Sequence, residues 1–402
     1  MTKQILKSVT IPFLIILFRD IRLFITPRLW AEEGTIYFRE AFFGGFKSIF
    51  EPSLGYYSFF PRTFSYIASL FPIEMAPLIM TIFSLSIWLI PHILIGLSKN
   101  EYLLSYRNKT ICSLVLILTA PSDEIFINSI NLHFLTPWIL ILIGIDNFQK
   151  VSKTQTVIYL ILIWLSILNG PVAMFVLPIY AYFILSQKKI KFLFISMLPV
   201  LIQLFCIINY DSKNSIYDRF DFSLKEFGQV FYYRTLIYPY LGSFSVPHSL
   251  FNLIGMQKIL NFQNTIFIFY LCFILYSIYK KNKFTSSLLL GSLIVSILTY
   301  ASALNPKYPG LLIGGDRYFY LPNTMISIGH LFFILQENRI MRFTASFSLL
   351  LILLCLYSSG TEYITKSPYC SDCANWKTEV QQNFKTSKKI EIWPKGWSID
   401  FN

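Results

Sequence analysis

The chain has 402 residues, of which 54% are hydrophobic and only 14% are charged, and its formal net charge is +13. Soluble domains carry about 25% charged residues, so this composition excludes an ordinary soluble globular protein. The surplus of Lys and Arg is weak evidence for nucleic-acid binding, because these residues are scattered in short clusters between apolar runs. With a mean hydropathy of +0.55, the apolar runs predict an all-α polytopic membrane protein.

Apolar runs that suit membrane helices recur along the whole chain. No small-residue cleavage site follows the first run, so we expect it to be retained as a span. Several runs are shorter than about 20 residues, and we expect polar ends or neighbouring helices to shield them. We predict about eleven transmembrane helices, at residues 8–25, 76–97, 110–122, 130–145, 157–169, 171–186, 192–209, 264–279, 285–301, 322–336 and 344–360.

The distribution of Lys and Arg predicts the orientation. Clusters such as "SQKKIK", "KKNK" and "ENRIMR" fall in short connections on one side of the predicted spans, which the positive-inside rule assigns to the cytoplasm. The N-terminus is then cytoplasmic, and an odd number of spans places the C-terminus outside. The longer connections lie outside, so we expect the chemistry there. The expected domains are a transmembrane domain over residues 1–360 and an external C-terminal tail over residues 361–402.

The stretch "RLWAEEGTIYFREAF" follows the first predicted span and carries two adjacent carboxylates, Glu32 and Glu33. Residues 35–50 and 58–71 have the pattern of interfacial helices lying on the membrane, the first one broken or capped by glycines. Neighbouring carboxylates raise one another's pKa, which would leave one as a general base and the other to orient a hydroxyl. The alternative is a solvated pair that caps an interfacial helix at its N-terminus.

Such a loop suits the transfer of a sugar from a lipid-phosphate donor. A carboxylate takes the proton of the acceptor hydroxyl. The phosphate leaves as an anion and needs cationic partners, for which Arg has the best shape. Near the end of the first span, Arg19, Asp20 and Arg22 either pair with one another and snorkel or line a cavity.

A later segment, "NPKYPGLLIGGDRYFYLP", is another candidate for the site. Its tyrosines, Tyr318 among them, have faces that can stack on a sugar ring, and Lys307 and Arg317 can bind phosphate. The alternative is an interfacial aromatic belt with anchoring cations.

Two loops resemble those of bacterial membrane glycosyltransferases of the GT-C fold. In one branch of that family, a Trp-Ala-Glu-Asp-Gly motif is followed by a Gly-Tyr…Pro-Arg motif. The matching residues of the first loop are Trp30, Ala31, Glu32, Gly34, Gly55, Tyr56, Pro61 and Arg62, with Glu33 where Asp is commoner. The matching residues of the second loop are Pro121, Glu124, Asn128, Asn131 and His133, and the Asn-Gly-Pro sequence at 169–171 also fits.

This resemblance implies an inverting, integral inner-membrane hexosyltransferase of bacteria. It would move a hexose, with glucose as one option, from a polyprenyl-phosphate carrier to a periplasmic glycan such as O-antigen, in lipopolysaccharide modification. Its partners would be the lipid-linked sugar donor, a glycan or lipid-linked acceptor and membrane lipid. The implied catalytic residues are Glu32 and Glu33, and the implied substrate-binding residues are Arg62, Tyr56, Glu124, Asn131, His133, Lys307, Arg317 and Tyr318.

No cofactor is expected. A divalent cation held by Glu32, Glu33 and water lacks supporting ligands, because no metal-binding spacing joins the four histidines. In the tail, Cys370 and Cys373 are close enough in sequence for a disulfide in an oxidising compartment. The last residues of the tail cover the mouth of the site or touch the sugar; the alternative is a small lid packed on the external loops.

Two other functions stay open. An O-antigen polymerase or ligase is also an external-loop enzyme, and it would depend on Arg219 and Arg234 more than on the Glu pair. A non-enzymatic polysaccharide transporter or flippase would need ionisable residues in the middle of its spans, and the predicted spans have few of them.

Overall fold

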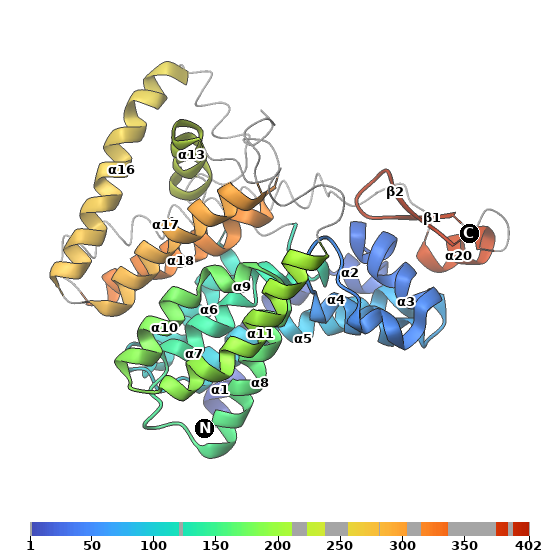
Figure 1. Ribbon diagram of the computed structural model, residues 1–402, viewed down its shortest axis with the longest axis horizontal. Coiled ribbons are helices and arrows are strands. Elements are labelled where there is room, and N and C mark those ends of the chain that lie inside the picture. Colours follow the sequence, from blue (N-terminus) through green and yellow to red (C-terminus); the bar gives the residue numbers. More distant parts are fainter. Residues whose placement is uncertain are drawn as a thin grey trace.

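The computed structural model describes residues 2–119, 124–210, 223–237, 256–280, 282–303, 315–336, 375–384 and 389–401. Within these ranges the chain is mostly helical and contains 16 α-helices. Figure 1 shows the helices packed against one another, with the C-terminal elements beside α2, α3 and α4 at one end of the molecule. Several predicted features lie outside the described residues, namely the span at 344–360, Pro121, Arg219, Lys307, Cys370 and Cys373.

The α-helices in chain order are α1 (Thr2–Arg19), α2 (Arg22–Ile25), α3 (Arg39–Gly44), α4 (Phe59–Ser69), α5 (Ala76–Leu97), α6 (Tyr106–Leu118), α7 (Pro137–Ile145), α8 (Lys153–Leu168), α9 (Val172–Phe175), α10 (Leu177–Ser186), α11 (Ile190–Asn209), α13 (Leu224–Val230), α16 (Met256–Tyr279), α17 (Lys283–Ala303), α18 (Arg317–Gln336) and α20 (Trp376–Asn383). Two π-helices, η1 (Glu33–Phe38) and η6 (Phe231–Ile237), occur among the described residues. Short 3₁₀ helices are η2 (Gly45–Phe50), η3 (Ile73–Met75), η4 (Glu101–Leu103) and η5 (Ile130–Phe134).

Three helices of the described chain are long and apolar enough to cross a membrane: Ile73–Leu97, Ile190–Asn209 and Lys283–Ser302. The sequence predicted all three to within a few residues, and they indicate a membrane protein. Five further apolar helical segments have 10–17 residues. Two of these segments, Val9–Arg19 and Tyr270–Tyr279, are parts of the longer helices α1 and α16.

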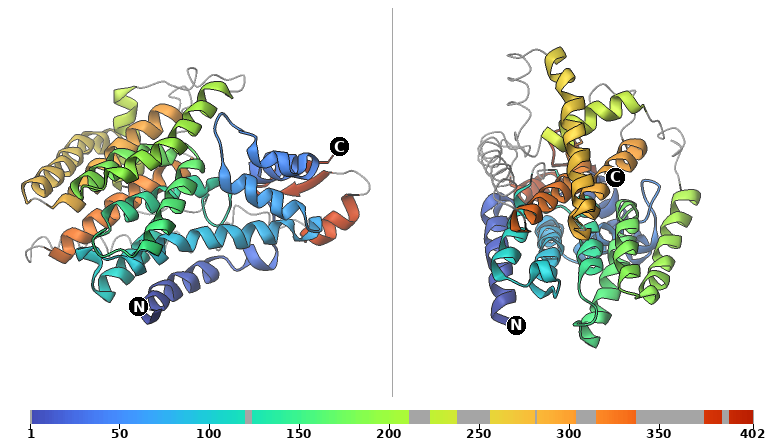
Figure 2. Two further views of the ribbon diagram at one scale, coloured as in Figure 1. Left: turned by 60° about the horizontal axis from the view of Figure 1, so that its bottom comes forward. Right: turned by 90° about the vertical axis from the view of Figure 1, so that its left-hand side faces the viewer.

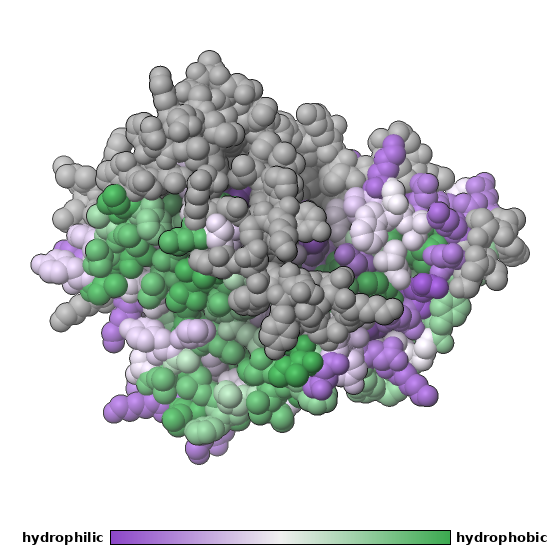
Figure 3. All heavy atoms as spheres, turned by 45° about the horizontal axis from the view of Figure 1, so that its top comes forward, coloured by the Kyte–Doolittle hydropathy of each residue, from purple (hydrophilic) through white to green (hydrophobic). Residues whose placement is uncertain are grey.

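Hydrophobic side chains cover much of the helical body, while hydrophilic ones gather at the end that carries α3 and the C-terminal elements (Figure 3).

At the start of the chain, α1 packs along α5 (Figure 2). The first predicted span is interrupted, because α1 ends at Arg19 and α2 starts only at Arg22. Between them, Asp20 pairs with Arg22 through a 2.9 Å contact from Nε to Oδ1, which confirms the expected mutual pairing.

A buried carboxylate ties the far ends of several helices together. Asp146, directly after α7, accepts hydrogen bonds from the Ser98 hydroxyl (3.1 Å), the Lys99 backbone N–H (2.5 Å) and the Tyr159 hydroxyl (2.6 Å). These donors come from the connection after α5 and from α8. Asp146 therefore fixes the end of α7 against two neighbouring helices.

The C-terminal elements differ from the all-α prediction. Strands β1 (Lys389–Ile392) and β2 (Trp397–Asp400) form an antiparallel hairpin in which Ile390 pairs with Ile399. Alternation of charged and apolar residues along β1 suits a strand with one buried face. Gly396, at a φ of +94°, supplies the left-handed residue of the turn.

Candidate functional site

The first loop begins after α2 and contains η1, α3 and η2, where the sequence predicted an interfacial helix over 35–50. A helical run is present, and Gly45, at a φ of +58°, breaks it after α3 as expected. Its outward face carries exposed phenylalanines, including Phe43 and Phe46. The second predicted helix, with Arg62 on it, is α4. These elements place the two glutamates at the start of η1.

Glu33 points into the protein, where the fold occupies both of its oxygens. Oε1 accepts hydrogen bonds from the Ser129 backbone N–H (2.9 Å) and hydroxyl (2.6 Å), and Oε2 accepts one from the Trp30 N–H (3.0 Å). The residue is 3% exposed, and burial raises the pKa of the Glu33 carboxyl against the opposing effect of these hydrogen bonds. Glu33 thus joins the first loop to the second loop, residues 124–134.

Glu32 faces different neighbours. It is half-buried, and its charge acts on the phenols of Tyr37 and Tyr56 and on the guanidinium of Arg317. Burial raises the pKa of Tyr37 to about 12 and that of Tyr56 well above its ordinary value. Both phenols therefore stay protonated at neutral pH, and Glu32 is the carboxylate of the pair that lies beside neutral hydroxyls and a cation.

Charged residues from three further segments surround Arg317. The Arg317 backbone N–H donates to Glu124 Oε2 (3.2 Å), and its guanidinium interacts electrostatically with both Glu124 and Glu32. The preceding residue, Asp316, forms an ion pair with Arg234. Burial raises the pKa of Glu124, while the charge of Arg317 opposes this rise. We call Glu32, Glu124, Arg234, Asp316 and Arg317 the charged cluster.

Arg234 is the least exposed member of the charged cluster, with a side chain only 3% exposed. It lies on the π-helix η6, its guanidinium stands 4.8 Å from the centre of the Phe319 ring, and its carbonyl accepts a hydrogen bond from Asn323 Nδ2 (2.9 Å). Phe319 and Asn323 both belong to α18. The same helix therefore begins at Arg317, directly after Asp316, and fixes Arg234 beside them.

Asn131 supports the second loop. Its Nδ2 donates to the Glu124 carbonyl (2.7 Å), and Asn128 Nδ2 donates to the same oxygen (2.6 Å). Asn128 Oδ1 also accepts from the Asn131 N–H (3.0 Å). These two amides fold residues 124–131 into a compact turn, which sets the position of Glu124.

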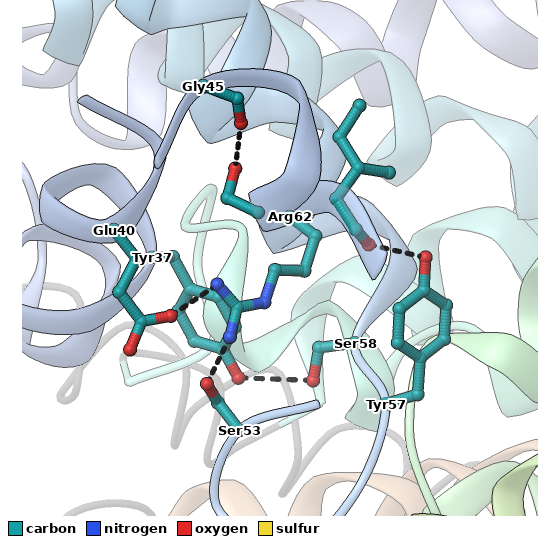
Figure 4. Close-up of polar contacts among 9 residues, drawn as sticks. Tyr37, Glu40, Gly45, Ser53, Tyr57, Ser58 and Arg62 are labelled. Atoms are coloured by element: carbon teal, nitrogen blue, oxygen red, sulfur yellow. Dashed lines mark hydrogen bonds and ion pairs between the residues drawn. The ribbon is translucent and has the colours of Figure 1, made fainter. Parts of the chain in front are cut away.

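Arg62 is engaged by its own surroundings (Figure 4). The guanidinium is buried, pairs with Glu40 and the Ser53 hydroxyl, and lies 5.0 Å from the centre of the Tyr37 ring. Tyr37 in turn donates to the Ser58 hydroxyl (3.1 Å). Arg62 therefore connects α4 with α3 and with the Tyr37 ring.

Aromatic rings pack beside Arg317. Tyr56 meets His133 edge to face with ring centres 5.9 Å apart, Phe134 meets Tyr318 in the same way at 5.3 Å, and Arg317 lies 5.2 Å from the Tyr318 ring. Gly170, at a φ of +136°, allows this packing, because a Cβ there would lie 2.9 Å from the His133 Cβ. Such rings offer apolar faces next to the charged cluster.

Unusual backbone conformations occur in the two loops that Glu33 connects. Ala31 has a φ of +39° and Ile127 a φ of +48°, and such conformations cost about 1–3 kcal/mol in residues other than glycine. Both π-helices of the described chain also carry site residues, Tyr37 on η1 and Arg234 on η6. Strained backbone and π-helices are often found at functional sites.

The structure brings together six of the residues proposed from sequence: Glu32, Tyr56, Glu124, His133, Arg317 and Tyr318. Glu33, Arg62 and Asn131 serve in hydrogen bonds or ion pairs around them, and Lys307 lies outside the described residues. Sequence reasoning missed the roles of Ser129 and Tyr37, which no local motif marks.

In the described part of the chain, no group of three or more His, Cys, Asp or Glu side chains is arranged to hold a metal ion. Comparison of the chain with family models, curated proteins and solved structures found no match.

Proposed function

We propose that this chain is an integral membrane glycosyltransferase with a GT-C-like fold, which transfers a hexose from a polyprenyl-phosphate carrier to a glycan such as O-antigen. The observation that carries the proposal is the electrostatic interaction of Glu32, a half-buried carboxylate, with the Arg317 guanidinium and with the phenols of Tyr37 and Tyr56. A base, a cation and aromatic faces are the groups that this reaction needs.

Glu32 accepts the proton of the acceptor hydroxyl as its oxygen attacks the anomeric carbon. The bond between that carbon and the phosphate oxygen breaks, and the phosphate leaves with the electron pair, so the configuration inverts. Arg317 stabilises the departing anion, which needs no proton. Protonated Glu32 then returns its proton to water. Glu33 and Asn131 keep the two loops in place.

The proposed setting is the bacterial inner membrane, with about eleven spans and a cytoplasmic N-terminus. Contacts between loops support the proposed sidedness. The second loop meets the first through Ser129 and Glu33, and the C-terminal hairpin meets the first through the Trp393 N–H, which donates to the Leu29 carbonyl (3.0 Å). These contacts support a first loop and a C-terminus on the same side of the membrane, as an odd number of spans requires.

One observation favours the second candidate, an O-antigen polymerase or ligase. Arg234, on which that alternative depends, is buried beside Asp316 in the charged cluster rather than in a separate place. The two reactions would then use one site with different leading residues, Glu32 in the first and Arg234 in the second.

The experiment replaces Glu32 and Glu33 singly with Gln and Arg234 with Ala, and measures glycan modification in cells by mass shift. We expect Glu32→Gln to reduce modification about 10²- to 10⁴-fold, the usual contribution of a general base. Glu51→Gln, an exposed change in the same loop, is the matched control. Normal modification by Glu32→Gln would refute the glycosyltransferase proposal, and loss in Arg234→Ala alone would favour the polymerase or ligase.

A further inference from the structure

The C-terminal elements α20, β1 and β2, which we call the C-terminal cap, dock on the first loop beside Glu32. Apolar contacts bind them together: Phe401 of the cap meets Phe42 of α3 with ring centres 5.3 Å apart. Gly34 permits the close approach, since a Cβ there would lie 2.8 Å from Ile399 and 2.9 Å from Ile392. The cap is therefore packed against the helix that starts at Glu33.

Main-chain hydrogen bonds reach closer to the charged cluster. The Trp393 N–H donates to the Leu29 carbonyl (3.0 Å), and the Ala31 N–H donates to the Trp393 carbonyl. Ala31 is the residue at a φ of +39°, and it directly precedes Glu32. On the other side of Glu32, the Glu33 carboxylate is bound to Ser129. The backbone of Glu32 is thus held from both neighbours, by the cap and by the second loop.

A buried ion pair anchors the cap. Arg28 Nη2 contacts Glu379 Oε2 at 2.6 Å, and the two side chains are 3% and 9% exposed. Glu379 Oε1 accepts from the Glu391 N–H (2.7 Å), and Arg28 Nη1 donates to the Glu391 carbonyl (2.5 Å). Arg28 and Glu379 therefore connect the first loop, α20 and β1 in one hydrogen-bonded unit.

The same unit is fixed to a candidate membrane helix. Trp376, at the start of α20, donates from its indole N–H to the Ile73 carbonyl (3.0 Å), and Ile73 begins the apolar segment that runs to Leu97. Residues 28–31 are therefore anchored, through the C-terminal cap, to a long helix. Removing the Arg28–Glu379 ion pair would release residues 28–31 from this anchor without changing any member of the charged cluster.

We propose that the C-terminal cap belongs to the catalytic apparatus, with Arg28 and Glu379 as positioning residues that set the direction of Glu32 through the Trp393–Ala31 hydrogen bond. The inference rests on the proposed role of Glu32 as the base. Because the cap acts on the base and not on the substrate, its disturbance lowers kcat and leaves KM almost unchanged.

The test compares full-length Glu379→Gln with wild type in detergent, using polyprenyl-phosphoglucose as donor and lipid-linked O-antigen as acceptor. Since misplacing a catalytic group by about 1 Å costs roughly 100-fold, we expect kcat to fall about 10- to 100-fold while KM for both substrates stays within about 2-fold. Glu379→Asp, which can still pair with Arg28, should regain part of the rate. Lys377→Gln, an exposed change on the same helix, should match wild type.

Should Glu379→Gln accumulate poorly, Arg28→Lys provides the second variant, because it keeps the charge next to Glu379 but loses a donor to Glu391; the same drop in kcat is expected. Wild-type kcat in both folded variants, alongside an inactive Glu32→Gln, would overturn the role of the cap and leave the proposed function standing. A rise in KM with unchanged kcat would also overturn it, in favour of substrate binding by the cap. An active Glu32→Gln would instead remove the proposed function itself.

Discussion

Ser129→Ala tests the link between the first and second loops by removing a single oxygen atom. The Ser129 hydroxyl lies 2.6 Å from Glu33 Oε1 and is fully buried. Its loss leaves the carboxylate with two of its three described hydrogen bonds, both from backbone N–H groups. A hydrogen bond contributes about 0.5–1.5 kcal/mol and one to a charged group about 1.5–3 kcal/mol, so we expect the free energy of unfolding to fall by about 0.5–3 kcal/mol, or the unfolding equilibrium to rise about 2- to 150-fold.

The assay is denaturant or thermal unfolding of the purified protein in detergent at neutral pH. Ser86→Ala is the control, because the exposed Ser86 hydroxyl only donates to the Ile82 carbonyl one turn earlier (3.0 Å), and we expect a change below about 0.5 kcal/mol. The cost of Ser129→Ala should shrink as pH falls through the raised pKa of Glu33, because the Ser129 hydroxyl favours the charged carboxylate. Equal stability of Ser129→Ala and wild type at neutral pH would refute the idea that Glu33 holds the loops together.

Three further predictions concern stability. Burial raises the pKa of Glu33 in the folded state, so the protonation of Glu33 stabilises the fold fully below the unfolded pKa of about 4.3. This stabilisation is lost as pH rises through the folded pKa. Unfolding of wild type and of Glu33→Gln, compared across this pH range, should show the difference. Gly170→Ala should destabilise by about 1–3 kcal/mol, because φ is +136° and the new Cβ would meet His133; a neutral change would contradict that geometry. Asp146→Ala should cost about 3 kcal/mol or more by leaving four donors unpaired, and in-cell modification per folded molecule should stay normal.

The sequence was sufficient for the long apolar helices. Composition and length alone define α5, α11 and α17, since an uninterrupted apolar run has few alternatives to a helix. The first span was less predictable, because Asp20 pairs locally with Arg22 and ends α1 early. The C-terminal hairpin was missed, as its short strands acquire a buried face only by docking on the first loop.

The site could be predicted by residue type and not by role. The motif pointed to both Glu32 and Glu33, yet only contacts distant in sequence separate them, Ser129 for Glu33 and Arg317 for Glu32. Likewise, Arg62 has the character of a phosphate ligand in sequence, but Glu40 already neutralises it in the fold. Local patterns cannot reveal partners that the chain brings together from almost 200 residues away, as it does for Glu124 and Arg317.

The central claim is that Glu32 and Arg317 face one substrate between them. Cryo-electron microscopy of the full chain in lipid nanodiscs, with a non-cleavable phosphonate analogue of polyprenyl-phosphoglucose, tests it most directly. The account predicts the phosphonate against Arg317, with the anomeric carbon on the side of Glu32. An analogue bound on the opposite face of the membrane, or with Glu32 turned away from the sugar, would contradict it.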